Sequence, residues 1–291
     1  MKPAPFAFVR PTTLEEALEA LAGHPGAKVL AGGQSLVPLL SMRLAAPAML
    51  VDINALPDLA HVTVVDGSAA GVRVGALARH ADVLGSAEAA RAQPLVSMAL
   101  QHVAHPTIRN RGTTVGSLVH ADAAAEMPMV LLLLGGSVDV ASVRGRRTIP
   151  ADELFAGPLE TTLAEDEIAV EAWFPALPAG AGVGFAEIAR RHGDYALVGV
   201  AAVVEHDGDE VVGARLGFVS VSDVPVVVDV TEAVRDPDGD PAEVALAALD
   251  PAADIHATAE YRAHLARVLV RRVLAQATEH ARERAQERTD A

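Results

Sequence analysis

A run of small residues at positions 176–182, Ala-Leu-Pro-Ala-Gly-Ala-Gly, constrains the fold of this chain more than any other feature. It follows an apolar, strand-like run from Ile168 to Phe174 that ends at Pro175, and proline cannot donate a hydrogen bond to a neighbouring strand. The chain has 291 residues, of which 51% are hydrophobic, so it can fill more than one core. We therefore predict two domains, residues 1–175 and 176–291.

The first part alternates short apolar runs with turns. Thr12 and Thr13, three residues before Glu15 and Glu16, predict a capped helix that ends near Gly23. Further elements are expected at 28–30 (strand), 36–44 (helix), 49–53 (strand), 62–65 and 71–75 (a hairpin), and 94–103 (helix). A polar stretch at 105–116, a buried apolar helix at 129–134, a strand at 137–143 and a loop at 148–163 follow. This order indicates an α+β domain with subdomains of about 1–55 and 56–175.

The second part begins as an antiparallel sheet and ends in helices. Two β-rich runs, 196–205 and 211–220, flank His-Asp-Gly-Asp, a strong hairpin signal. A short helix is expected at 240–249 and a longer one at 258–276, with Tyr261, Leu265, Val268 and Leu269 on its apolar face. The charged tail from 278 to 291 is expected to fray.

Composition excludes several classes of function. The chain has no cysteine, so it cannot hold a thiolate-ligated iron–sulfur cluster or form a disulfide. Its net charge of −15 disfavours nucleic acid. No apolar run approaches the roughly 20 residues of a membrane span, and no signal pattern begins the chain, so we expect a cytoplasmic protein. Redox chemistry here would need a cofactor without thiolate ligands, or a partner that carries the clusters.

A glycine turn, Ala31-Gly-Gly-Gln-Ser35, lies between a predicted strand and a predicted helix. Glycines let backbone N–H groups approach a diphosphate, and a helix N-terminus favours its negative charge. A bare structural turn is an equally good interpretation of this motif alone. The G-x-G-x-x-G spacing of a Rossmann site is absent.

A second polar stretch, residues 106–126, concentrates hydroxyls, glycines and isolated charges before the buried helix, and long polar loops of this kind often bind ligands. His120 and Asp122, with His102 and His105, could suggest a metal site, but nothing fixes a tetrahedral arrangement. Hydrogen bonding within the loop is the favoured interpretation, and we predict neither a metal site nor a catalytic residue.

Together these motifs resemble a known family. Ala31-Gly-Gly-Gln-Ser35, Ile108-Arg-Asn-Arg-Gly-Thr113 and His120-Ala-Asp, followed by Glu126-Met-Pro128, are similar to the FAD-binding medium subunits of the carbon monoxide dehydrogenase and xanthine dehydrogenase family. Arg190-Arg-His-Gly-Asp-Tyr195 and the segment 254–272 resemble that family's C-terminal domain. The likeness covers nearly the whole chain.

The resemblance implies a two-subdomain FAD-binding fold of the vanillyl-alcohol-oxidase (PCMH) type, followed by a smaller α+β domain. By this resemblance the diphosphate contacts come from Lys28, Ala31, Gly32, Gly33, Gln34, Ser35 and Leu36. A second phosphate- and ribose-side loop would contain Thr113, Gly116 and Ser117, with Glu126 near the adenosine ribose. Asp122 is also expected to bind the cofactor. Ile168 and Ala169 would lie on a strand beside the cofactor, and Arg190, Asp194 and Tyr195 near the flavin ring.

The sequence departs from the family pattern at three positions. Val115 replaces a glycine, and a β-branched residue resists positive φ and would crowd a close cofactor. Ala123 replaces a usual proline, and Ala186 stands where some relatives have lysine.

The expected function is electron transfer within an oxidoreductase complex. FAD on this chain would receive electrons from iron–sulfur clusters on a small partner subunit, after a large molybdenum-cofactor subunit has hydroxylated a substrate, and would pass them to an external acceptor. The resemblance suggests a dimer of heterotrimers. Two alternatives are a stand-alone flavin oxidoreductase of the vanillyl-alcohol-oxidase type and a structural subunit that has lost FAD.

Overall fold

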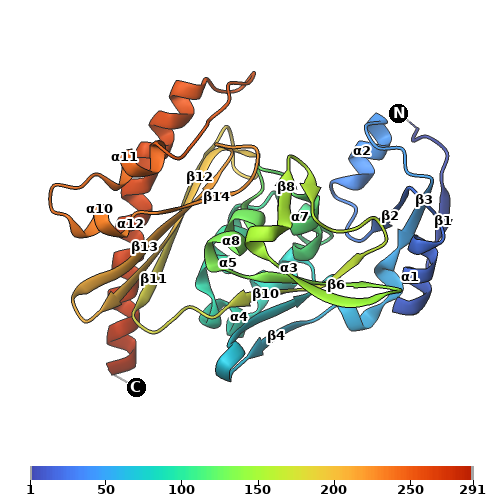
Figure 1. Ribbon diagram of the computed structural model, residues 1–291, viewed down its shortest axis with the longest axis horizontal. Helices are drawn as coiled ribbons and strands as arrows, with labels where there is room; N and C mark the ends of the chain where they lie inside the picture. Colours follow the sequence, from blue (N-terminus) through green and yellow to red (C-terminus); the bar gives the residue numbers. More distant parts are fainter. Residues whose placement is uncertain (1, 290–291) are drawn as a thin grey trace.

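The computed structural model describes residues 2–289 and has an α+β fold built on successive sheets (Figure 1). A three-stranded parallel sheet comes first, then a five-stranded antiparallel sheet, and then a four-stranded antiparallel sheet. The termini lie at opposite sides of the molecule in Figure 1, with the long C-terminal helix beyond the third sheet.

The first sheet has the order β1-β3-β2, and two crossover helices connect its strands. Its elements are β1 (Ala7–Val9), α1 (Leu14–Ala22), β2 (Ala27–Leu30), α2 (Leu36–Met42) and β3 (Met49–Asp52). The Thr13 side chain accepts a hydrogen bond from the Glu16 backbone N–H and fixes the start of α1, which buries Leu18 and Leu21. The helices and strands predicted for this part are confirmed, with boundary shifts of a few residues.

The second sheet has the order β4-β5-β10-β6-β7 and is covered by short helices. Its strands are β4 (Val62–Val65), β5 (Gly71–Gly75), β6 (Ser137–Ser142), β7 (Gly145–Pro150) and β10 (Ile168–Pro175). The helices are α3 (His80–Gly85), α4 (Ala87–Ala92), α5 (Pro94–His102), α6 (Pro106–Arg109), α7 (Thr114–His120) and α8 (Glu126–Leu134). Helix α8 contacts β10 on one side and β12 and β13 on the other, which explains why it is apolar all round.

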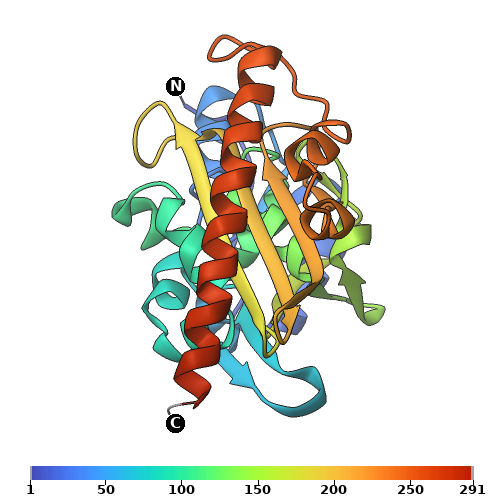
Figure 2. The ribbon, with the colours of Figure 1, turned by 90° about the vertical axis from the view of Figure 1, so that its left-hand side faces the viewer.

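The third sheet has the order β11-β12-β13-β14. Its strands are β11 (Ala181–Ala189), β12 (Ala196–Asp207), β13 (Glu210–Val219) and β14 (Val226–Asp229). The predicted β12–β13 hairpin is confirmed, with Gly208 in the left-handed region at its tip. Figure 2 shows α12 (Ala259–Thr289) lying across one face of this sheet, with α10 (Thr231–Arg235) and α11 (Pro241–Leu246) beside it.

The long helix corrects two predictions. Helix α12 continues to Thr289, so residues 278–289 stay helical, because Ala277 and Ala281 pack against β11. Residues 290–291 of the predicted tail lie outside the described residues. Leu265 and Leu269 are buried as predicted, but Tyr261 and Val268 are exposed. The buried face of α12 instead includes small residues and Arg262.

Two segments predicted as loops contain regular structure. Residues 148–163 include the second half of β7 together with α9 (Ala151–Leu154), β8 (Phe155–Gly157) and β9 (Glu160–Thr161). The stretch at 105–116 contains α6 and the start of α7. Residues 176–180 connect β10 to β11, while one hydrophobic core includes Phe174 before this connection and Val183 after it.

Candidate functional site

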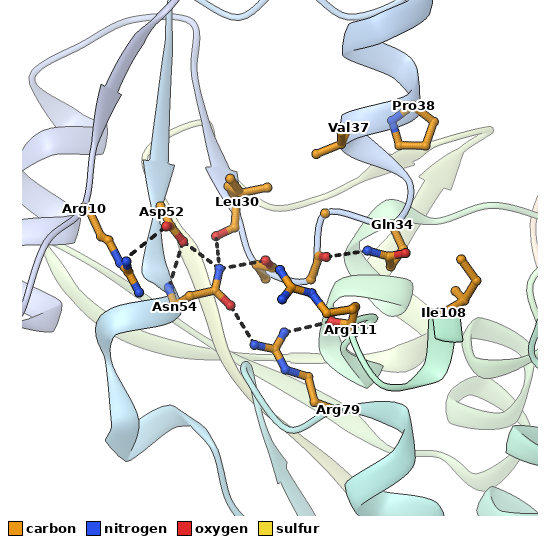
Figure 3. A pocket seen from close by; sticks show the side chains of 13 residues that line it. Arg10, Leu30, Gln34, Val37, Pro38, Asp52, Asn54, Arg79, Ile108 and Arg111 are labelled. Atoms are coloured by element: carbon orange, nitrogen blue, oxygen red, sulfur yellow. Dashed lines mark hydrogen bonds and ion pairs between the residues drawn. The ribbon is translucent and has the colours of Figure 1, made fainter. Parts of the chain in front are cut away.

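A cavity of about 760 Å³ opens between the first sheet and the helices of the second part (Figure 3). The glycine turn after β2, the segment after β3 and the residues around α6 form its walls. It is lined by Arg10, Leu30, Ala31, Gly32, Gly33, Gln34, Val37, Pro38, Asp52, Asn54, Arg79, Ile108 and Arg111. Four of the predicted binding residues, Ala31 to Gln34, therefore share one cavity.

The glycine turn presents backbone N–H groups that the protein does not use. Among residues 2–289, the N–H groups of Gly33, Gln34, Ser35 and Leu36 make no hydrogen bond to a protein acceptor. The carbonyls of Gly33 and Ser35 accept from the backbone of α2, and the neighbouring Gly32 carbonyl accepts from the Gln34 side chain at 3.0 Å. Successive unpaired donors at the start of a helix suit a phosphate oxygen. Gly33 has φ +73°, which favours glycine there.

The glycine turn touches the second predicted segment directly. A methyl group at Gly32 would overlap the Arg111 carbonyl oxygen and would lie 2.8 Å from Gly112 Cα. Only glycine permits this approach. Residues 32 and 111–112, which are far apart in sequence, therefore meet at the floor of the cavity.

Three arginines from separate segments give the cavity a positive charge. Figure 3 shows Arg10, Arg79 and Arg111 around the turn. Burial and then the charge of Arg111 lower the pKa of Arg79, so these two guanidinium groups lie near each other without full compensation. A bound anion would offset this repulsion.

Hydrogen bonds hold the walls together. The Arg79 guanidinium donates to the Arg111 carbonyl at 2.8 Å and to Asn54 Oδ1 at 2.7 Å. The Asn54 amide nitrogen donates to the Ala31 carbonyl at 2.8 Å and to Asp52 Oδ1 at 2.6 Å, and Arg10 lies 3.5 Å from Asp52. This network fixes the backbone on both sides of the cavity and leaves the amide donors of the turn free.

The segment from Thr113 to Ser117, predicted as a second phosphate- and ribose-side loop, lies at the start of helix α7. Thr113 caps helix α7, and its hydroxyl accepts from the Gly116 N–H at 3.1 Å while its carbonyl accepts from the Ser117 N–H at 3.1 Å. Those two amides are therefore occupied within the helix. Val115 has its side chain in the core, 2% exposed, and its φ is not positive. The substitution of glycine by valine is thus accommodated away from the cavity.

Four other predicted residues meet at a second cavity of about 320 Å³. Asp122, Arg190, Asp194 and Tyr195 line it, together with residues from the ends of β12 and β13 and from the segment before α12. Arg190 donates to Asp194 at 2.9 Å. Tyr195 exposes 61% of its surface, which leaves an aromatic face available for stacking.

The remaining predicted residues line neither of these cavities. Lys28 is exposed on β2, and Ser35 and Leu36 begin α2 at the cavity edge. Glu126 is buried at the start of α8, and Ile168 and Ala169 are buried in β10. Ala123 accepts a backbone hydrogen bond from Ser220, so this turn is anchored without a proline.

Nine residues that line this cavity were not predicted from the sequence: Arg10, Leu30, Val37, Pro38, Asp52, Asn54, Arg79, Ile108 and Arg111. Ile108 and Arg111 belong to a motif that the sequence analysis quoted, so their position was accessible. Arg10, Asn54 and Arg79 carry no local signal and are brought in by the fold. Within residues 2–289, no three or more His, Asp or Glu side chains are arranged to hold a metal ion, and no helix there could cross a membrane.

Comparisons with known proteins cover most of the chain. A family model described as the FAD binding domain in molybdopterin dehydrogenase matches residues 4–177, and one described as the CO dehydrogenase flavoprotein C-terminal domain matches residues 184–277. The nicotine 6-hydroxylase medium subunit of Paenarthrobacter nicotinovorans is 41% identical over 95% of this chain and 99% of its own length.

Solved structures show the same likeness. Carbon monoxide dehydrogenase from Hydrogenophaga pseudoflava matches with a TM-score of 0.90 and 32% identity over 96% of this chain and 99% of that one. Quinoline 2-oxidoreductase from Pseudomonas putida 86 matches with a TM-score of 0.89 and 36% identity over 97% and 99%.

Proposed function

Because this chain belongs to the FAD-binding medium subunits of the molybdopterin dehydrogenase family, oxidoreductases that include carbon monoxide dehydrogenase, we propose that it transfers electrons from partner iron–sulfur clusters to an external acceptor. When bound, FAD supplies the redox chemistry for this transfer. The chain has no cysteine, which supports the proposal that thiolate-ligated clusters lie on another subunit.

The observation that carries the proposal is the meeting of unpaired backbone N–H groups with arginines in one cavity. The amides of Gly33 to Leu36 would donate to the diphosphate, and Arg79 and Arg111 would offset its charge. Because Asn54 and Arg79 hold both walls through hydrogen bonds, the donors are arranged before the cofactor binds. Such preorganisation lowers the entropic cost of binding.

The second cavity would receive the ring end of the cofactor. Tyr195 offers an aromatic face, and Asp122, Arg190 and Asp194 offer polar groups around it. With the diphosphate held at the turn, these residues would orient the ring and limit its access to solvent. The position of Glu126 near the adenosine ribose stays a prediction, as does the second loop with Thr113, Gly116 and Ser117.

Partners are part of the proposal. A large subunit with the molybdenum cofactor would select and hydroxylate the substrate, and a small subunit would carry the clusters. A dimer of such heterotrimers and a cytoplasmic location stay predictions.

Titration of the purified, cofactor-free chain with FAD tests the binding step. We expect visible flavin absorbance that stays with the protein through gel filtration. A well-folded chain that fails to retain FAD would overturn the proposal.

The electron path is tested on the whole complex, isolated and analysed for flavin, iron and molybdenum. The complex is then reduced by its substrate, with and without this chain. Cluster reduction with no transfer to the acceptor is expected when this chain is missing.

A further inference from the structure

The turn between β11 and β12, residues 190–195, carries three of the residues that line the second cavity: Arg190, Asp194 and Tyr195. The hydrogen bonds of this turn are local. Arg190 donates to the Asp194 carboxylate at 2.9 Å, the Asp194 N–H donates to the Arg191 carbonyl at 3.1 Å, and the Tyr195 N–H donates to Asp194 Oδ1 at 3.1 Å. Local bonds fix the shape of a turn but not its distance from the rest of the protein. Turns at the surface move easily unless another element supports them.

Gly193 gives the turn a support from another part of the chain. Its φ is +79°, and a methyl group there would lie 2.5 Å from His105 Cε1 and 2.7 Å from the Ala104 carbonyl oxygen. Side-chain carbons do not approach other atoms this closely, so only glycine lets the turn lie directly against residues 104 and 105. The turn before β12 therefore rests on the segment that precedes α6.

The supporting segment is held in a backbone conformation that alanine disfavours. Ala104 has φ +45°, in the left-handed region. Arg109, the last residue of α6, donates from Nη1 to the Val103 carbonyl at 2.8 Å and to the Ala104 carbonyl at 3.0 Å. Its backbone N–H donates to the His105 carbonyl at 2.9 Å. A disfavoured conformation persists where surrounding contacts fix it. Arg109 therefore fixes the backbone on which Gly193 rests.

The same segment reaches the first cavity. Ile108 and Arg111 line that cavity, and the Ile108 carbonyl accepts from the Arg111 N–H at 3.0 Å. Gly32 of the glycine turn lies against the Arg111 carbonyl. Residues 104–111 therefore contact the glycine turn at one end and the turn at 190–195 at the other. One short segment supports the walls of both cavities.

We propose that His105 and Arg109 are positioning residues that hold the turn at 190–195 beside the second cavity. Arg109 fixes the left-handed Ala104, and Ala104 and His105 together set the place of Gly193. The rest of the turn follows, because its own hydrogen bonds fix its shape.

The consequence for the cofactor rests on the proposed function. Asp194 and Tyr195 directly follow Gly193, so a shift of Gly193 moves both of them relative to the second cavity. With FAD bound, this shift would change the surroundings of the ring. The backbone donors at residues 33–36 would keep their contacts with the diphosphate. His105 and Arg109 need not touch the cofactor to have this effect.

Hydrogen exchange of the cofactor-free chain tests the support without any ligand. Gly193→Ala forces the turn away from Ala104 and His105, so amides of residues 190–196 should exchange about 10-fold faster than in the wild type. Gly208→Ala is the matched control, because its φ is +60° and a methyl group there meets nothing within 4 Å. The control carries the cost of a left-handed alanine without an overlap, and its exchange at 190–196 should stay at the wild-type rate. Wild-type exchange in Gly193→Ala would overturn the proposal.

Two further variants change the support and leave the turn itself intact. Arg109→Met removes both hydrogen bonds from Nη1, and His105→Ala removes an exposed ring, so each should speed exchange at 190–196. The exposed Arg91→Met should not. These variants decide the case if Gly193→Ala does not fold. Wild-type exchange at 190–196 in both would overturn the positioning role.

The effect on the ring is measured separately, on the FAD-loaded chain. In His105→Ala the visible flavin spectrum and the reduction potential should shift, while FAD affinity falls less than about threefold because the diphosphate contacts remain. An unchanged spectrum and potential would overturn the effect on the ring. A wild-type chain that binds no FAD, together with faster exchange in the variants, would overturn the proposed function and support the positioning of the turn.

Discussion

The substitution Gly32→Ala tests whether contact between the two cavity walls is required for cofactor binding. The new methyl group would overlap the Arg111 carbonyl and lie 2.8 Å from Gly112 Cα, so the walls must separate by about 0.6 Å for the second contact alone to reach an ordinary 3.4 Å. Overpacking of this kind costs roughly 1–3 kcal/mol. If the cost falls on the geometry that holds FAD, affinity drops about 5- to 140-fold.

The assay is a titration of cofactor-free protein, followed by quenching of flavin fluorescence, together with denaturant unfolding of the same samples. Gly85→Ala is the matched control, because a methyl group there meets nothing within 4 Å and its φ is not positive. We expect the control to bind FAD like the wild type. If Gly32→Ala folds and binds FAD with unchanged affinity, the contact between the walls does not organise the site.

Three further substitutions test other parts of the structure. Val115→Gly should lower the free energy of unfolding by on the order of 2–4 kcal/mol, because Val115 fills the core at the start of a helix. The variant should not bind FAD more tightly. Tighter binding in an FAD titration would show that valine does obstruct the cofactor. Arg79→Met should weaken FAD binding about 10-fold, because the variant loses the hydrogen bonds to Arg111 and Asn54. The control Arg91→Met, at an exposed position, should bind FAD like the wild type. Equal FAD affinities of the Arg79 and Arg91 variants would contradict the role of Arg79 in holding the cavity walls. Burial lowers the pKa of His80 from 6.5 to about 4, so the unfolded chain binds more protons than the folded chain between these pH values. The free energy of unfolding therefore falls by about 3 kcal/mol in total as pH falls from 6.5 to 4. His80→Gln should flatten this part of a stability–pH profile, and a wild-type slope in that variant would refute the assignment.

Local signals in the sequence predicted the elements whose caps and turns are formed by residues that are neighbours in sequence. The Thr13 cap fixes α1, and the Asp207-Gly208 turn fixes the β12–β13 hairpin, because in each case the residues that direct the backbone are neighbours in sequence. The glycine turn was predicted for the same reason, since a strand, two glycines and a helix occupy one short stretch.

Long helices and polar stretches were predicted less well. Tyr261 and Val268 lie on the helical period expected for a core face, yet Arg262 is buried in their place. Its guanidinium donates to the distant Ser220 carbonyl and to the Asp254 carboxylate, and these partners make a buried charge acceptable. The polar segment at 113–117 likewise became a helix start, because Thr113 satisfied its amides.

The sequence by itself determined that this chain is an α+β protein with a glycine turn fit for a phosphate, and its motifs indicated the correct family. The tertiary structure decided which side chains surround that turn. Arg10, Asn54 and Arg79 come from three segments with no common pattern. The physical reason is that local hydrogen bonds and periodicity depend on neighbours in sequence, whereas the charge and burial of a site depend on which distant surfaces pack together.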